Sequence, residues 1–141
     1  MMIVAFNPSH LDRLLLQPSQ ALMQPTLADP SYGPSLAAAG PAYSAVDGDA
    51  VFACAGIIPQ WEGRAVAWAL IASEAGRNMV RIHKAVSRAL AVHQYRRIET
   101  AVASDFEQGH RWALMLGFER EGRMRGYTPD GRDCDLYARV H

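Results

Sequence analysis

The stretch MLGFEREGRMRGYTPDGRDCDLYARV, from Met115 to Val140, decides the fold of this chain. It begins as the last apolar turn of a helix that opens at a predicted capping box, Ser104 to Glu107. Gly117 follows at the position where helices commonly end on a left-handed residue. Phe118 then starts a run of alternating charged and apolar residues, and a Pro129-Asp130-Gly131 turn leads into a second such run. The stretch therefore predicts a helix, ending at Leu116, that passes directly into a two-stranded hairpin.

A strand–helix–strand unit precedes this hairpin. Residues 64–72 are nearly all apolar and predict a strand that is buried on both faces in the middle of a sheet. In residues 78–94, apolar side chains recur on one helical stripe and basic side chains on the opposite one, with Asn78 as the expected N-cap. Residues 96–103 alternate as a strand. Because a helix joins the two strands, we expect them to be parallel, with a right-handed crossover.

The first 63 residues supply further strands and a proline-rich segment. The elements expected there are a strand over 2–6, one or two helical turns over 8–16, short helical pieces and loop over 17–41, strands over 42–46 and 50–58 around an Asp47-Gly48-Asp49 turn, and a turn over 59–63. Altogether the order predicts an α/β (α+β) fold with one mixed central sheet of about six to seven strands, flanked by helices.

The composition is that of one globular domain, which we take to span residues 1–141. Half of the residues are hydrophobic, and the 14 basic and 14 acidic residues cancel, so the charge favours neither nucleic acid nor a membrane as a partner. No apolar run approaches the roughly 18 residues of a membrane span, and the start has no signal-peptide pattern, so we expect a cytoplasmic protein. Cys54 and Cys134 are expected to be reduced and partly buried, and the scattered histidines predict no metal site.

The order of elements and the closing stretch together resemble the GNAT superfamily of acyl-CoA N-acyltransferases. The residues LMLGF and the EREG that follows resemble the helix-to-strand junction of this family, and the hairpin after them carries an Asp and a Tyr near its end as the family's does. The resemblance covers residues 42–140 in detail and residues 1–41 by the order of elements. Small GNAT-like proteins of tailed phages have a similar ending.

The resemblance implies that acetyl-CoA lies where the two parallel strands, 64–72 and 96–103, splay apart, and that an amine attacks its thioester directly. It implies that the backbone of the first strand pairs with the pantetheine arm and that the following loop and helix start meet the phosphates. The corresponding cofactor-binding residues are Leu70, Ile71, Ala72, Arg77, Asn78 and Arg81. The alternative interpretation of the basic stripe that includes Arg77 and Arg81 is a solvated helix face.

The phosphate-binding loop and the helix before the junction both depart from the family pattern. The phosphate-binding loop of the family has small residues where this chain has Val80 and Ile82, and their side chains would crowd a phosphate. The family's frequent tyrosine, four residues before the junction glycine, is Ala113 here. No residue therefore inherits by position the role of the acid that protonates the leaving thiolate.

Acyl transfer to an amine needs a base for the amine and an acid for the thiolate. The candidates are Glu62 and Glu99 as bases and Tyr127 as acid, with Tyr137 or His110 as alternatives for the acid and Trp61 as a residue that lines the acceptor site. Each glutamate could instead be a solvent-facing charge.

Two functions follow from these observations. The first is an acetyl-CoA-dependent N-acetyltransferase that acts on a small-molecule or peptide amine of unknown identity. The second is a GNAT-like structural or interaction protein without acetyl transfer, such as one associated with a phage virion. In either case strand 132–140 could pair across a homodimer.

Overall fold

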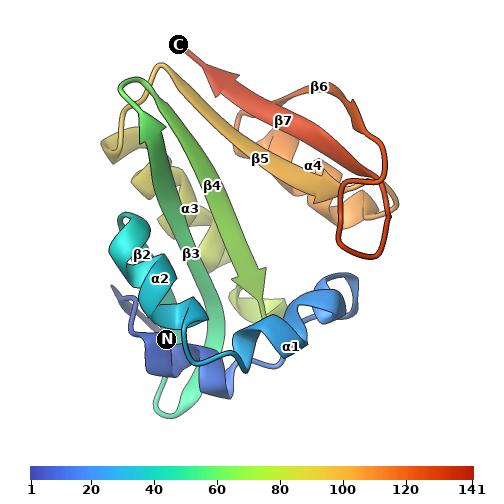
Figure 1. The fold of residues 1–141 in the computed structure, drawn as a ribbon. Coiled ribbons are helices and arrows are strands. Elements are labelled where there is room, and N and C mark those ends of the chain that lie inside the picture. Colours follow the sequence, from blue (N-terminus) through green and yellow to red (C-terminus); the bar gives the residue numbers. More distant parts are fainter.

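Seven segments of apolar or alternating sequence pair into one mixed sheet in a computed structural model that describes residues 1–141 (Figure 1). The strands are β1 (Met2–Ala5), β2 (Ala42–Asp47), β3 (Ala50–Trp61), β4 (Arg64–Ile71), β5 (Arg97–Ala103), β6 (Glu119–Met124) and β7 (Cys134–Val140). Their order in the sheet is β1-β2-β3-β4-β5-β7-β6, and all neighbours are antiparallel except β4 and β5. The predicted mixed sheet with two parallel central strands is therefore confirmed.

Helices cover both faces of this sheet (Figure 1). They are η1 (Pro8–Arg13), η2 (Pro18–Met23), α1 (Gln24–Leu27), α2 (Tyr32–Ala39), η3 (Gly76–Asn78), α3 (Met79–Val92) and α4 (Glu107–Met115), where η marks a 3₁₀ helix. The proline-rich segment is thus a series of short helices, as its sequence predicts. None of the helices has the length and apolar character that a membrane span requires.

The two helical layers hold β4 between them. Leu70 packs with leucines of the N-terminal helices in one cluster, and Ile71 packs with Ile82 of α3 in another. Successive side chains of a strand point to opposite faces, so the apolar run of β4 supplies both clusters. At α4 and the closing hairpin, Ala113, Phe118 and Tyr137 form the third cluster with residues of α3, β4 and β5.

Strand β3 extends farther than its sequence predicts. Residues 59–61, expected in a turn, still pair with β4, and the register shifts between Pro59 and Trp61. Proline lacks the N–H that a regular ladder needs, and a bulge tolerates that loss. The turn is therefore reduced to Glu62 and Gly63, and Trp61 stays on the strand.

Neither predicted cap side chain bonds to its helix. Asn78 is the N-cap residue of α3, as predicted, but its side chain makes no capping hydrogen bond. It also ends the turn η3, where its N–H donates to the carbonyl of Ala75 (2.7 Å). The N-cap of α4 is Phe106, and no side chain accepts from the first N–H groups of this helix. The hydroxyl of Ser104 points instead to β7, where it donates to the buried carboxylate of Asp135 (2.6 Å).

Gly117 ends α4 with a positive φ of 90°, as predicted. The N–H of Phe118 donates to the carbonyl of Ala113 (3.0 Å), which turns the Phe118 side chain into the core, where it is 3% exposed. Strand β7 then inserts between β5 and β6 and pairs antiparallel with both.

Replacement of Gly117 by alanine should lower the free energy of unfolding by about 1–2 kcal/mol, because an L residue is strained at this φ. Gly122 is the matched control, since its φ is not positive and an added Cβ meets nothing within 4 Å. Urea denaturation of Gly117→Ala and Gly122→Ala measures the difference. Equal midpoints for the two variants would contradict the left-handed helix end.

Candidate active site

The central feature of the sheet is the divergence of β4 from β5. Their parallel ladder contains only three residue pairs and ends at Val66 and Glu99 (Figure 1). The next contact is made by a side chain, because the hydroxyl of Thr100 donates to the carbonyl of Ala67 (3.0 Å). Beyond it the strands diverge toward their carboxyl ends, which leaves one edge of β4 without a neighbouring strand.

Alternate residues of β4 present their backbone to this open edge. The N–H of Ala72 donates to the carbonyl of Phe52 on β3 (2.8 Å), so Leu70 and Ala72 direct their backbone groups to β3 and only Ile71, between them, faces β5. Four edge groups nevertheless have partners from the N-terminal segment: the carbonyl of Ala69, the N–H and carbonyl of Ile71 and the N–H of Ser73, bonded to Gln20, Gln17 and Leu15.

The loop after β4 exposes the basic side chains predicted to meet phosphates. Arg77 and Arg81 are exposed on both sides of the start of α3, and the guanidinium of Arg81 donates to the carbonyl of Met1 (3.1 Å). Ile82 is 3% exposed and packs into the core, and Val80 is 64% exposed on the helix surface. A Cβ on Gly76 would meet nothing within 4 Å, so the outer side of the loop is open.

A charged network closes the other end of the strand pair. Glu99 of β5 receives hydrogen bonds from Arg64 of β4 and from Arg97 (2.8 Å), and Arg97 also holds Glu121 in a two-bond contact (2.6 and 2.9 Å). Burial alone would raise the pKa of Glu99, but the two guanidinium groups outweigh it and leave the pKa below its ordinary value. Glu99 is therefore an ionised, doubly paired carboxylate at neutral pH.

The predicted catalytic and acceptor residues do not converge. Trp61 and Glu62 lie at the amino end of β4, where the Trp61 ring is 63% exposed and stacks 4.4 Å from the Arg64 guanidinium. Glu99 lies in the last ladder pair. Tyr127 is exposed in the loop between β6 and β7, beyond the carboxyl end of β5. Their roles remain predictions.

A second polar network, largely missed by sequence reasoning, connects α4 to β7. His110 contacts the Tyr137 hydroxyl (2.7 Å) through Nδ1 and the Ser104 carbonyl (2.9 Å) through Nε2. Asp135 accepts from Ser104 (2.6 Å) and Arg120 (2.8 Å), and hydrogen bonds from Arg120 and Ser104 lower its pKa to about 2. The available signal was an acidic residue beside a cysteine at the start of a mostly apolar strand. Burial raises the pKa of Tyr137, which keeps its hydroxyl protonated.

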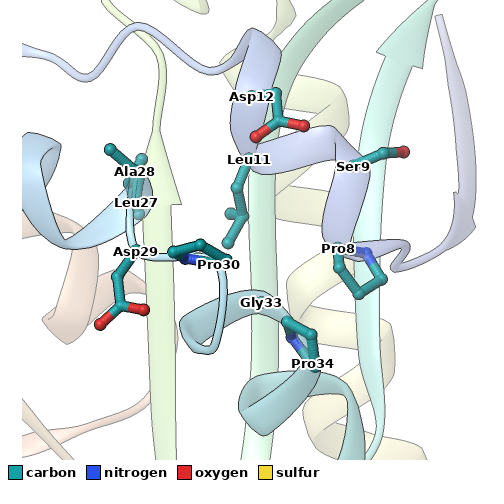
Figure 2. A pocket seen from close by; sticks show the side chains of 10 residues that line it. All are labelled: Pro8, Ser9, Leu11, Asp12, Leu27, Ala28, Asp29, Pro30, Gly33 and Pro34. Atoms are coloured by element: carbon teal, nitrogen blue, oxygen red, sulfur yellow. The ribbon is translucent and has the colours of Figure 1, made fainter.

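A surface pocket of about 390 Å³ lies between η1 and the connection from α1 to α2 (Figure 2). It is lined by Pro8, Ser9, Leu11, Asp12, Leu27, Ala28, Asp29, Pro30, Gly33 and Pro34. It belongs to the N-terminal helical layer, and the proline-rich segment 17–41 supplies part of its lining. No cluster of three or more potential metal ligands is present in the molecule.

Comparison with known proteins bears on the fold. No protein-family model matches the chain, and no curated protein matches it in sequence. Among solved structures, an aminoglycoside 6'-acetyltransferase type Ii superposes with a TM-score of 0.73 at 20% identity, over 99% of this chain and 97% of its own. The chain has the fold of the GNAT N-acetyltransferases.

Two further structures agree with this fold. An aminoglycoside 6'-N-acetyltransferase in complex with coenzyme A gives a TM-score of 0.72 at 16% identity, over 99% of this chain and 97% of its own. A GNAT-family acetyltransferase from Bacillus anthracis gives a TM-score of 0.69 at 12% identity, over 98% of this chain and 93% of that protein. At such identities the likeness concerns the fold alone, and the chemistry has to be argued from this chain's own residues.

The Asp135 network should make stability depend on pH in the acid range. Because its folded pKa of about 2 lies below the ordinary 3.8, Asp135 stabilises the fold above about pH 4, and this contribution is lost as pH falls toward 2. Asp135→Asn should therefore lower the free energy of unfolding at pH 7 and differ less from the parent chain near pH 2. The exposed Asp105 supplies the control variant Asp105→Asn, and urea titrations across this range make the measurement. A pH-independent deficit would contradict the ionised pair.

Proposed function

We propose that the chain is an acyl-CoA-dependent N-acyltransferase, with acetyl-CoA as the acyl donor and a small-molecule or peptide amine as acceptor. The observation that carries this proposal is the three-pair ladder between β4 and β5 at the centre of a GNAT-type sheet. A strand that diverges from its neighbour presents an edge to which an extended amide-containing arm can add.

The residues along this edge are suited to such a donor. Ile71 directs its backbone to the open side of β4, flanked by Leu70 and Ala72, whose burial fixes the strand. Ile82 points into the core, which keeps its side chain away from the outer side of the loop, and Val80 is exposed on the helix surface. The backbone of this edge is compatible with an acyl-CoA once the edge of β4 is free.

Charge at the start of α3 would hold the phosphates. Arg77 and Arg81 are exposed there, with Asn78 between them, and the amino end of a helix favours anions through its dipole and N–H groups. When bound, acyl-CoA supplies the activated thioester carbonyl. The chain's part is to orient that group and the amine and to move the proton.

The predicted groups for proton transfer differ in their pairing and exposure. Glu99 is ionised but paired with Arg64 and Arg97, so it is a weak base that could act on an amine only through water. Glu62 is the alternative base, and its side chain is exposed to solvent. For the thiolate, Tyr127 is the exposed candidate, and the Tyr137–His110 pair is the protonated, hydrogen-bonded alternative.

A second candidate function is a GNAT-like structural or interaction protein without acyl transfer, such as a component of a phage virion. Two observations favour it. Ala113, at the position of the family's tyrosine, is 4% exposed and packs in the core, so no hydroxyl projects from there. The edge of β4 at Ile71 is also already bonded within the chain.

Calorimetric titration with acetyl-CoA separates the two functions. We expect binding, weakened about three- to tenfold in Arg77→Ala and in Arg81→Ala, because each variant removes a charge-assisted phosphate contact. Arg88→Ala is the matched control, since Arg88 is an exposed arginine two to three turns farther along α3. If the chain does not bind at millimolar acetyl-CoA, the transferase proposal is wrong and the interaction function stands.

A further inference from the structure

A segment of the N-terminal layer behaves as an added strand on the open edge of β4. We call residues 15–20 the strap. Leu16 forms an antiparallel bridge with Ala72, the N–H of Gln17 donates to the carbonyl of Ile71 (2.9 Å), and the N–H of Ser73 donates to the carbonyl of Leu15 (2.9 Å). The strap thus pairs with β4 on the side from which β5 has diverged.

At its end the strap continues this pairing with a side chain. The carboxamide of Gln20 donates through Nε2 to the carbonyl of Ala69 (2.7 Å) and accepts through Oε1 from the N–H of Ile71 (2.8 Å). One planar amide therefore satisfies a carbonyl and an N–H two residues apart, which is how the peptide group of a neighbouring strand would bond. An incoming amide-containing arm would need the same two backbone groups.

The start of the strap is held firmly by buried residues, but the part that carries Gln20 is held weakly. Gln24 accepts from the N–H of Leu16 (3.0 Å) and donates to the carbonyl of Leu14 (3.0 Å), and both leucines are buried. The helix η2, which carries Gln20, contains no buried residue. Few buried apolar contacts mean a low free energy of local opening, so η2 can leave β4 while Leu14 and Leu16 stay in place.

We propose that Gln20 is a gate on the cofactor site, a self-made amide that must leave Ala69 and Ile71 before the amide-containing arm of an acyl-CoA can pair there. This inference rests on the proposed function. The apparent affinity for the donor is then the intrinsic affinity reduced by the fraction of molecules in which Gln20 is released. Removal of the Gln20 carboxamide should raise that fraction.

The gate makes a prediction opposite in sign to that for an ordinary contact residue. Gln20→Ala should bind coenzyme A about tenfold more tightly than the parent chain, because two hydrogen bonds no longer compete with the ligand. Gln20→Glu should bind less tightly than Gln20→Ala, since its carboxylate cannot donate to the Ala69 carbonyl but still accepts from the N–H of Ile71. Gln60→Ala is the matched control, because Gln60 is an exposed glutamine whose carboxamide bonds only to the carbonyl of Ile58 (3.2 Å). Its affinity should equal that of the parent chain.

Calorimetry with coenzyme A, supported by circular dichroism to confirm that each variant is folded, makes the test. Tighter binding by Gln20→Ala than by the parent chain, or binding by Gln20→Ala when the parent does not bind, supports the gate. If the parent chain binds and Gln20→Ala binds equally or more weakly, the gate is wrong and the transferase proposal survives. If neither the parent nor any variant binds, the transferase proposal itself fails and the gate fails with it.

Discussion

The parallel pairing of β4 and β5 ends after three residue pairs. Other parts of the molecule therefore have to bond to the backbone groups of β4 that β5 no longer reaches. A strand in the middle of a sheet cannot leave its N–H and carbonyl groups without partners. Thr100 supplies the first partner beyond the ladder, at Ala67, and the strap supplies those for Ala69, Ile71 and Ser73. The N-terminal layer therefore completes the sheet as well as covering it.

Divergence of two strands also requires that their other end be held. The ion pair between Arg64 of β4 and Glu99 of β5 spans the strands at the closed end, and Arg97 extends it to Glu121 of β6. Removal of one partner would leave a buried charge, which costs far more than the intact pair contributes. Glu99 therefore holds β4 and β5 together at the end where they pair. At the open end the strap bonds to β4 through hydrogen bonds that a ligand can replace.

The sequence predicted what depends on local pattern and failed where a polar side chain acts at a distance. A continuous apolar run located β4, helical periodicity located α3, and Gly117 located the end of α4, because each signal is contained in a few neighbouring residues. Gln20 bonds to Ile71 across 51 residues from a proline-rich segment without periodicity, so nothing near it announced the contact. The Ser104 capping box failed for the same reason, since its hydroxyl serves a distant carboxylate.

Residue-resolved amide hydrogen exchange of the free chain tests the central claim, that the open edge of β4 is closed by the strap. The N–H groups of Ile71 and Ala72 both make 2.8 Å hydrogen bonds, the first to the Gln20 side chain and the second to the backbone of β3. We expect Ile71 to exchange more slowly than an unbonded amide but faster than Ala72, because only the weakly anchored η2 must open to release it. Exchange of Ile71 at the rate of an unbonded amide would contradict the closed edge, and exchange as slow as that of Ala72 would contradict a strap that can open.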